Sequence, residues 1–223
     1  MMTSLTRTAL LVSFLLAATY ALQAQTVRAS QGVAKLTLEP LPPFTVSCQV
    51  TDIPAGYKVL YPDLRQAALA EGRQSLFYKT VSGGEEFTVE RGIEETATGV
   101  RITDSFPEEA AGLQLAKVLI VEFKGEDVAD AVLEFIDGNK ADAGGQRCSE
   151  MVGSFRKWGG VTCSGIRLTY PAGEKLVVAF EEPTTVSAHG PVGDEPGSYS
   201  FRLAYPESPS KSTFAFHLEG KGK

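Results

Sequence analysis

The chain has 223 residues, and its 21 Lys and Arg against 27 Asp and Glu give a formal net charge of −6 at pH 7. This balance lacks the positive surface with which proteins hold phosphate backbones, so nucleic acid is excluded as a partner. A chain of this length buries a core of ordinary size without help from disulfides, and a single domain is expected.

The N-terminal segment predicts a secretory signal peptide. Arg7 supplies a positive charge, an apolar run follows from Ala9 to Ala18, and a region of small residues ends at Ala24. The apolar run is much shorter than the roughly 20 residues that span a bilayer. We therefore expect residues 1–24 to be cleaved, leaving residues 25–223 as one secreted or periplasmic domain without a stable membrane anchor.

Alternating polar and apolar residues predict β-strands through most of the remaining chain. In "FTVSCQV" the apolar positions share one face with Cys48, which is therefore expected to point into the core. Comparable signals occur at 33–39, 75–81, 85–90, 99–104, 166–170, 175–180, 198–205 and 212–220. Because turn residues separate these segments at short intervals, we expect an antiparallel sandwich or a barrel-like sheet.

Two segments depart from this pattern and predict short helices. The first, 62–72, begins with Pro62 and ends at Gly72. The second, 125–138, repeats a β-branched residue every fourth position and ends at Gly138. Segment 113–123 is almost continuously apolar, as is typical of a strand covered on both faces. The predicted class is α+β and β-rich, with an all-β sandwich as the alternative.

Three cysteines in an oxidising compartment are expected to form one disulfide and leave one thiol. Pairing Cys148 with Cys163 closes a loop of about 15 residues, worth roughly 3 kcal/mol in the chain-entropy model. Either pairing with Cys48 would instead join distant strands. We predict the Cys148–Cys163 bond, because Cys48 lies on an apolar face where a thiol behaves as a small hydrophobic side chain.

No coherent catalytic set is evident, and we expect neither a metal nor a cofactor. The chain has two histidines: His189 lies in a polar loop, whereas His217 lies on the solvent side of a strand. Acidic doublets occur at 85–86, 94–95, 108–109 and 181–182. Neighbours in a strand point to opposite faces, so a pair of catalytic carboxylates would need acids from two different doublets.

The segment "RCSEMVGSFRKWGG" contains the strongest candidate for a contact surface. Phe155 and Trp158 fall at helical spacing beside Arg156 and Lys157, which allows two interpretations. An amphipathic helix would bury the aromatic side chains against the sheet. An exposed helix would instead form an aromatic and basic patch with the residue types that anchor interfaces.

The sequence thus predicts a secreted, non-enzymatic binding or interaction module that contacts a protein or carbohydrate partner through the Cys148–Cys163 loop. One alternative is a small secreted hydrolase that uses carboxylates or His189. Another alternative is a structural component of an envelope or extracellular layer.

Overall fold

The computed structural model describes residues 25–30, 32–63, 72–140, 145–151, 160–189, 198–204 and 211–219. Its described elements are mostly antiparallel strands with three short helices, arranged as a sandwich without a closed barrel. The predicted β-rich antiparallel sandwich is therefore confirmed. The predicted signal peptide lies outside the described residues.

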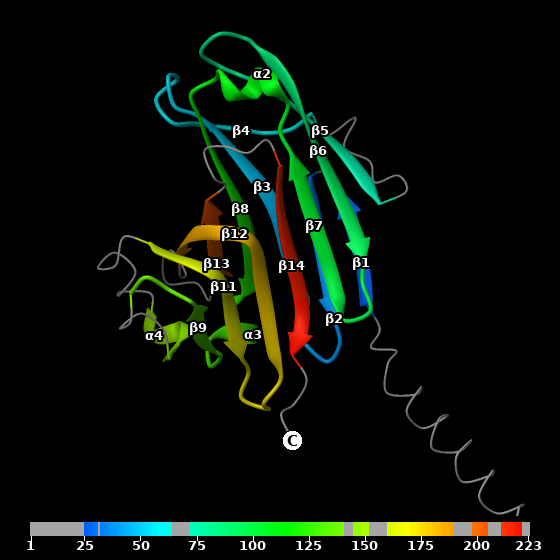
Figure 1. The fold of residues 1–223 in the computed structure, drawn as a ribbon, viewed down its shortest axis with the longest axis vertical. Helices are drawn as coiled ribbons and strands as arrows, with labels where there is room; N and C mark the ends of the chain where they lie inside the picture. The colour runs from blue at the N-terminus through cyan, green and yellow to red at the C-terminus, as the bar shows by residue number, and fades with distance from the viewer. Residues whose placement is uncertain are drawn as a thin grey trace, which may run out of the picture.

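The strands form two facing layers (Figure 1). The first layer has the order β1 (Gln25–Ser30), β2 (Val33–Leu38), β3 (Phe44–Asp52), β8 (Leu115–Lys124) and β13 (Ser198–Ala204), and β4 (Lys58–Leu60) also pairs with β3. The second has the order β5 (Arg73–Lys79), β6 (Glu86–Glu95), β7 (Gly99–Ser105), β14 (Lys211–Glu219), β12 (Lys175–His189), β11 (Val161–Thr169), β9 (Val132–Ile136) and β10 (Gln146–Arg147).

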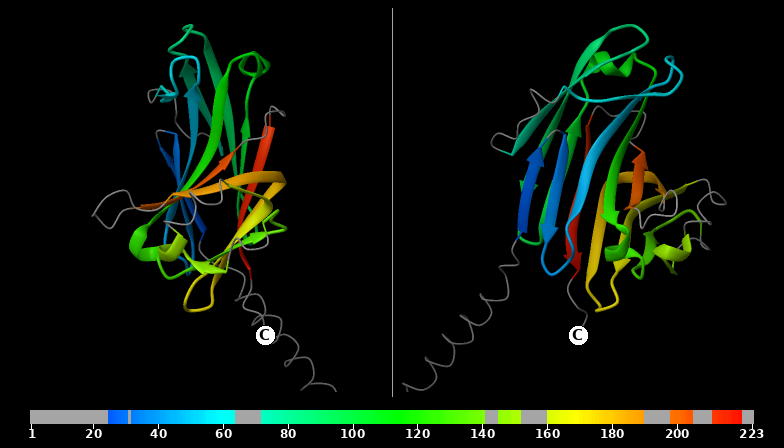
Figure 2. Two further views of the ribbon diagram at one scale, coloured as in Figure 1. Left: turned by 90° about the vertical axis from the view of Figure 1, so that its left-hand side faces the viewer. Right: turned by 180° about the vertical axis from the view of Figure 1, so that it is seen from behind.

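The long strand β12 belongs to both layers. Its residues 175–180 pair with β14, whereas its residues 186–189 pair with β13. Pro183 lies between the two paired stretches, where the missing backbone N–H of proline interrupts no ladder bond. The strand curves from one layer to the other (Figure 2), which is how strands form the corners of a sandwich.

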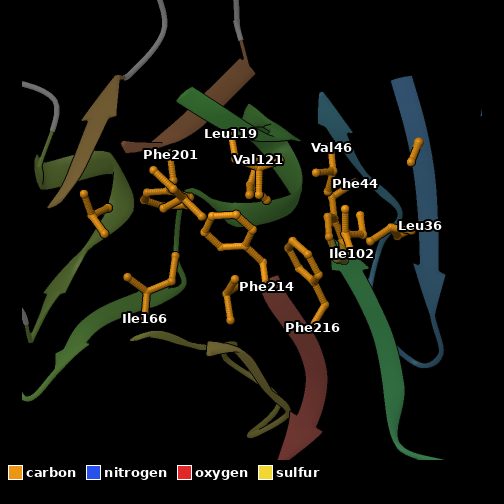
Figure 3. Close-up of a cluster of buried hydrophobic side chains, with 14 of the residues drawn as sticks. Leu36, Phe44, Val46, Ile102, Leu119, Val121, Ile166, Phe201, Phe214 and Phe216 are labelled. Atoms are coloured by element: carbon orange, nitrogen blue, oxygen red, sulfur yellow. The ribbon is translucent and has the colours of Figure 1, made fainter. Parts of the chain in front are cut away.

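Aromatic side chains fill the space between the layers (Figure 3). Phe44 of β3 meets Phe216 of β14 across the layers, with ring centroids 5.7 Å apart. On the first layer Phe44 also stacks on Phe123 at 5.1 Å. Cys48 is 8% exposed on this inner face, which confirms its predicted direction. On β14 the phenylalanines point inward and His217 lies on the outer, partly exposed face, as predicted.

The helix predicted over 125–138 is wrong in extent. Only α3 (Gly125–Val128) is helical, and the chain then continues as β9. The sequence "VLEFI" is rich in β-branched and aromatic residues, which favour strands, and it pairs with both β10 and β11. Tertiary pairing therefore overrides the four-residue apolar repeat. Of the helix predicted at 62–72, residues 64–71 lie outside the described residues.

The other two helices are single turns, α2 (Glu108–Ala111) and α4 (Cys148–Met151). The apolar segment 113–123 corresponds to β8, which is central between β3 and β13. Only its inner face is fully covered, because Glu122 is exposed on the outer face.

A row of polar side chains crosses the inner face of the second layer. Gln74, Arg91, Asp104 and Ser212 occupy successive paired positions on β5, β6, β7 and β14, and all four are buried. The Arg91 Nε and Nη2 atoms each donate to a carboxylate oxygen of Asp104 at 2.7 Å. Arg91 Nη1 also donates to the Gly32 carbonyl at 3.2 Å, so this ion pair attaches the β1–β2 turn to the second layer.

Candidate functional site

The contact surface predicted from sequence lies outside the described residues. Phe155, Arg156, Lys157 and Trp158 all fall within 152–159, between α4 and β11. Their predicted role therefore stays a prediction.

The structure disagrees with the predicted Cys148–Cys163 disulfide, because both residues are free thiols. Cys148 follows Arg147, which pairs with Val132, and Val132 pairs in turn with Thr169 at one end of β11. Cys163 lies toward the other end of β11. Six residues separate it from Thr169, and at 3.3 Å per residue this is about 20 Å along the strand. Disulfides need Cα atoms within about 7 Å, so this strand order keeps the two cysteines apart.

Both thiols are also unsuited to nucleophilic chemistry. Cys148 is 2% exposed and Cys163 is 1% exposed. Burial raises the pKa of Cys148 to about 12 and the pKa of Cys163 to about 11. Because the thiolate is the reactive species, both sulfur atoms stay protonated and inert at neutral pH.

Of the two histidines, His189 lies at the end of β12, where its backbone pairs with Ser200 of β13. Its side chain is outside what the structure describes. His217 pairs with Val177 and Gly99 in the middle of the second layer.

Two acids from different doublets do line one groove, on the outer face of the second layer. Glu94 and Glu181 border a groove of about 530 Å³ whose floor includes Ala179 and Ala215. Successive paired positions on β6, β7, β14 and β12 are occupied by Glu94, Arg101, Ala215 and Ala179. Glu181 lies two residues beyond Ala179 on β12. Strand spacings place their backbones about 16 Å apart.

Glycosidases need their two carboxylates about 5 to 9.5 Å apart. Glu94 is moreover held in an exposed ion pair with Arg101 at 2.9 Å. The groove thus places acids of two doublets on one face, with one of them already bound to a cation, and the hydrolase alternative stays a prediction. Within the described residues, no three side chains of metal-binding type form a group, and no helix is long and apolar enough to cross a membrane.

Exposed apolar side chains gather instead at the end of the sandwich that carries β4. We call them the tyrosine surface: Tyr57 (71% exposed), Val59 (38%), Tyr61 (81%) and Val81 (65%). In the described residues, one other large apolar side chain is comparably exposed, Val33 on β2. Isolated exposed apolar residues are ordinary, and these four form a candidate contact surface because they lie on neighbouring segments: the Val81 N–H donates to Asp52, whose backbone pairs with Lys58.

Part of the tyrosine surface follows from the alternation of β4. Leu60 is 4% exposed and points into the core, so Val59 and Tyr61 face the other way. Tyr57 lies outside β4, in the turn that precedes it, so its exposure does not follow from this alternation. The chain through β4 crosses the upper end of the molecule from β3 toward β5 (Figure 1), which carries these side chains around the edge of the sandwich.

Tyr57 has an unusual backbone conformation, with φ at 60°. This left-handed region is costly for a bulky residue and is occupied only where the surroundings impose it. Here the Tyr57 N–H donates to the Ile53 carbonyl at 3.3 Å, in a turn that also includes Gly56. The protein thus holds an aromatic side chain at a position where glycine would be easier to accommodate.

Asp52 holds the two loops of the tyrosine surface together. Its carboxylate accepts hydrogen bonds from the backbone N–H groups of Ala55, Val81 and Ser82 and from the Ser82 hydroxyl, at 2.8 to 3.2 Å. Burial alone raises the pKa of Asp52, but these hydrogen bonds outweigh it and hold the pKa below its ordinary value. The side chain is therefore ionised at neutral pH and holds both loops in place.

A groove adjoins the tyrosine surface at Tyr61. It has a volume of about 570 Å³ and is lined by Tyr61, Asp63, Phe77, Tyr78, Lys79, Glu86, Phe87 and Thr88. Backbone pairing positions it, because the Asp63 N–H donates to the Phe77 carbonyl at 2.8 Å. Lys79 and Glu86 face each other across β5 and β6 and form an ion pair of 2.7 Å.

The sequence contains one signal for this site that alternation alone does not resolve. In "YKVLY", residues 57–61, aromatic or apolar residues recur at alternate positions while Leu60 falls out of phase with them. Both faces of such a strand are apolar, and only one can face the core. Which one stays exposed depends on the pairing of β4 with β3.

No protein-family model matches the chain, and no curated protein matches it. Among solved structures, it is similar to the α-N-acetylgalactosaminidase NagBb from Bifidobacterium bifidum in its complex with GalNAc, with a TM-score of 0.46 and 10% sequence identity. The match covers 89% of this chain and 36% of that enzyme.

Proposed function

We propose that this protein is a secreted, non-enzymatic module that binds a saccharide on the tyrosine surface. The observation that carries the proposal is that exposed Tyr61 lines a groove with hydrogen-bonding walls, with exposed Tyr57 four residues before it in the same segment. Secretion rests on the signal-peptide pattern of residues 1–24.

The chemistry of the surface suits a sugar. A sugar ring has an apolar face of C–H groups and a rim of hydroxyls, so it needs flat aromatic faces next to donors and acceptors. Tyrosine offers both in one side chain, and the groove adds Asp63, Lys79 and Thr88. Its volume lies within the roughly 300 to 1,000 Å³ of small-molecule sites.

The rigidity of the tyrosine surface favours a small ligand. The loops are fixed by Asp52, so little conformational entropy is lost when a small ligand binds.

The test is binding to an array of immobilised hexose, hexosamine and uronate oligosaccharides of one to six units, with hits measured by calorimetry. Replacing Tyr61 by alanine should weaken binding at least about tenfold, which corresponds to about 1.4 kcal/mol. Tyr61→Phe keeps the ring and should retain most of the affinity. Val33→Ala removes an exposed apolar side chain elsewhere and serves as the matched control.

Tyr57→Gly separates binding from stability. Glycine adopts the left-handed backbone without strain, so this variant should be at least as stable as the parent in urea and yet bind saccharide more weakly. The proposal is wrong if no saccharide on the array binds, or if Tyr61→Ala and Tyr57→Gly bind as well as Val33→Ala.

A further inference from the structure

A slot opens in the second layer where β12 and β14 separate. Their pairing ends at Phe180 and Phe214, and beyond this point β12 bends away toward the first layer (Figure 1). The pairing of β12 with β11 is interrupted at the same place, because it runs to Ala179 and resumes at Thr184. The strands therefore leave between them a cavity of about 220 Å³.

Buried side chains form the inner walls of this slot. Phe180 and Phe214 pack edge to face, with ring centroids 5.9 Å apart, and buried Thr184 and Ser212 lie beside them. The Thr184 hydroxyl donates to the Glu182 carbonyl at 2.9 Å, which stabilises the wall on the β12 side. At roughly 30 Å³ for each water molecule, the volume corresponds to about seven waters. The slot therefore suits a compact ligand with a small apolar part.

Charged side chains of both signs stand at the mouth of the slot. Lys211 on β14 and Glu181 and Glu182 on β12 are exposed and line the cavity. Among the described residues, none of these three side chains has an ion pair or a hydrogen bond. A ligand with a single charge would meet a like charge here, whereas a ligand with both charges finds a partner for each.

The slot is reached through the larger groove on the outer face of the second layer. The two cavities share Glu181 and Lys211, so a ligand enters past these two side chains. The other two charged groups of that groove, Glu94 and Arg101, bind each other at 2.9 Å. The uncompensated charges are therefore those at the mouth of the slot.

We propose that this slot binds a free aliphatic amino acid in its zwitterionic form. Lys211 holds the α-carboxylate of the ligand, and Glu181 and Glu182 face its α-ammonium. The aliphatic side chain enters the slot and contacts the rings of Phe180 and Phe214. The slot shares no residue with the tyrosine surface or its groove, so this proposal is independent of saccharide binding.

The experiment titrates the intact protein by calorimetry with leucine and with two analogues that each lack one of its charges. Isopentylamine has the ammonium without the carboxylate, and isocaproate has the carboxylate without the ammonium. Leucine should bind at least about tenfold more tightly than either analogue. Glycine, which has no side chain to fill the slot, should also bind more weakly than leucine.

Substitutions at the mouth assign the two ends of the ligand. Lys211→Gln should weaken leucine binding at least about tenfold and leave isopentylamine binding unchanged or tighter, because a like charge is removed. The double variant Glu181→Gln with Glu182→Gln should weaken leucine binding and leave isocaproate binding unchanged or tighter. Lys35→Gln removes an exposed charge from β2 in the other layer and is the matched control. Urea unfolding checks that all these variants remain folded.

The proposal is overturned if leucine does not bind, or if either analogue binds as tightly as leucine. It is also overturned if the Lys211 and glutamate variants bind leucine as well as Lys35→Gln does. Preference for leucine over both analogues, lost when either end of the mouth is neutralised, supports it.

Discussion

Replacing Asp104 by alanine should cost this protein a large part of its stability. The side chains of Arg91 and Asp104 are both 0% exposed, and two hydrogen bonds of 2.7 Å join them. The substitution removes both bonds and leaves a guanidinium inside the sandwich without its counter-charge. Breaking a buried pair in this way costs about 3 to 5 kcal/mol, against the 5 to 15 kcal/mol by which a domain is typically stable.

The same two strands provide a matched control. Glu94 and Arg101 pair directly across β6 and β7, as Arg91 and Asp104 do, but on the outer face. Their bond is 2.9 Å long and their side chains are 65% and 49% exposed. Exposed pairs contribute about 0.2 to 1 kcal/mol, so Glu94→Ala should lose no more than that. The difference in unfolding free energy between the two variants is therefore set by the burial of the ion pair and not by the length of its hydrogen bonds.

Urea unfolding monitored by circular dichroism measures both losses, with free energies obtained by linear extrapolation and compared at equal slope. The double variant Arg91→Met with Asp104→Leu should recover most of the stability, because apolar side chains of similar volume remove the uncompensated charge. The reasoning is refuted if Asp104→Ala and Glu94→Ala unfold at similar urea concentrations. It is also refuted if the double variant is no more stable than Asp104→Ala.

Three further outcomes follow from the structure. Titrating the denatured, unreduced protein with a thiol-reactive chromogen should give three thiols, and a count of one would restore the predicted disulfide. Tyr170→Phe should leave the unfolding free energy unchanged or raise it, because the buried Tyr170 hydroxyl lacks a partner among the described residues. Tyr78→Phe should lower the unfolding free energy by about 1 kcal/mol, because it removes a hydrogen bond to the Cys48 carbonyl. Equal effects of the two substitutions would contradict this reasoning. The Val81 N–H donates to Asp52, and its slow exchange should persist as the pH falls past the ordinary aspartate pKa of about 3.9 and be lost only as the pH falls through the lower pKa of Asp52 in the folded protein. Asp52→Ala should abolish this protection at every pH.

The alternation of the strands was predictable, and it also contained the buried ion pair. In "EEFTVERGIEE" Arg91 falls in phase with Phe87 and Val89, and in "VRITDS" Asp104 falls in phase with Ile102. A charged residue at an inward position of each neighbouring strand predicts a paired, buried charge. That pairing also needs the register between the strands, which periodicity within either strand does not provide.

The errors arose where long-range pairing decides the outcome. The repeat of Val128, Val132 and Ile136 fits a helix locally, but β9 is held as a strand between β10 and β11. The Cys148–Cys163 loop is short in sequence, yet β9 and β11 run antiparallel and keep its ends apart. The tyrosine surface was missed for a related reason, because only the pairing of β4 with β3 shows which face of "YKVLY" remains exposed.

The central position of β14 has a consequence for how the protein folds. The strands β5, β6 and β7 form a local meander, but the partner on the other side of β7 is β14, far away in sequence. Until residues 211–219 pair, β7 and β12 both present open edges, and the aromatic core lacks Phe214 and Phe216. Closing such a distant contact is slow, and exposed edges invite association between chains. Folding is therefore expected to finish only when β14 enters the sheet, and a chain truncated before Lys211 is expected to aggregate rather than fold into a smaller sandwich.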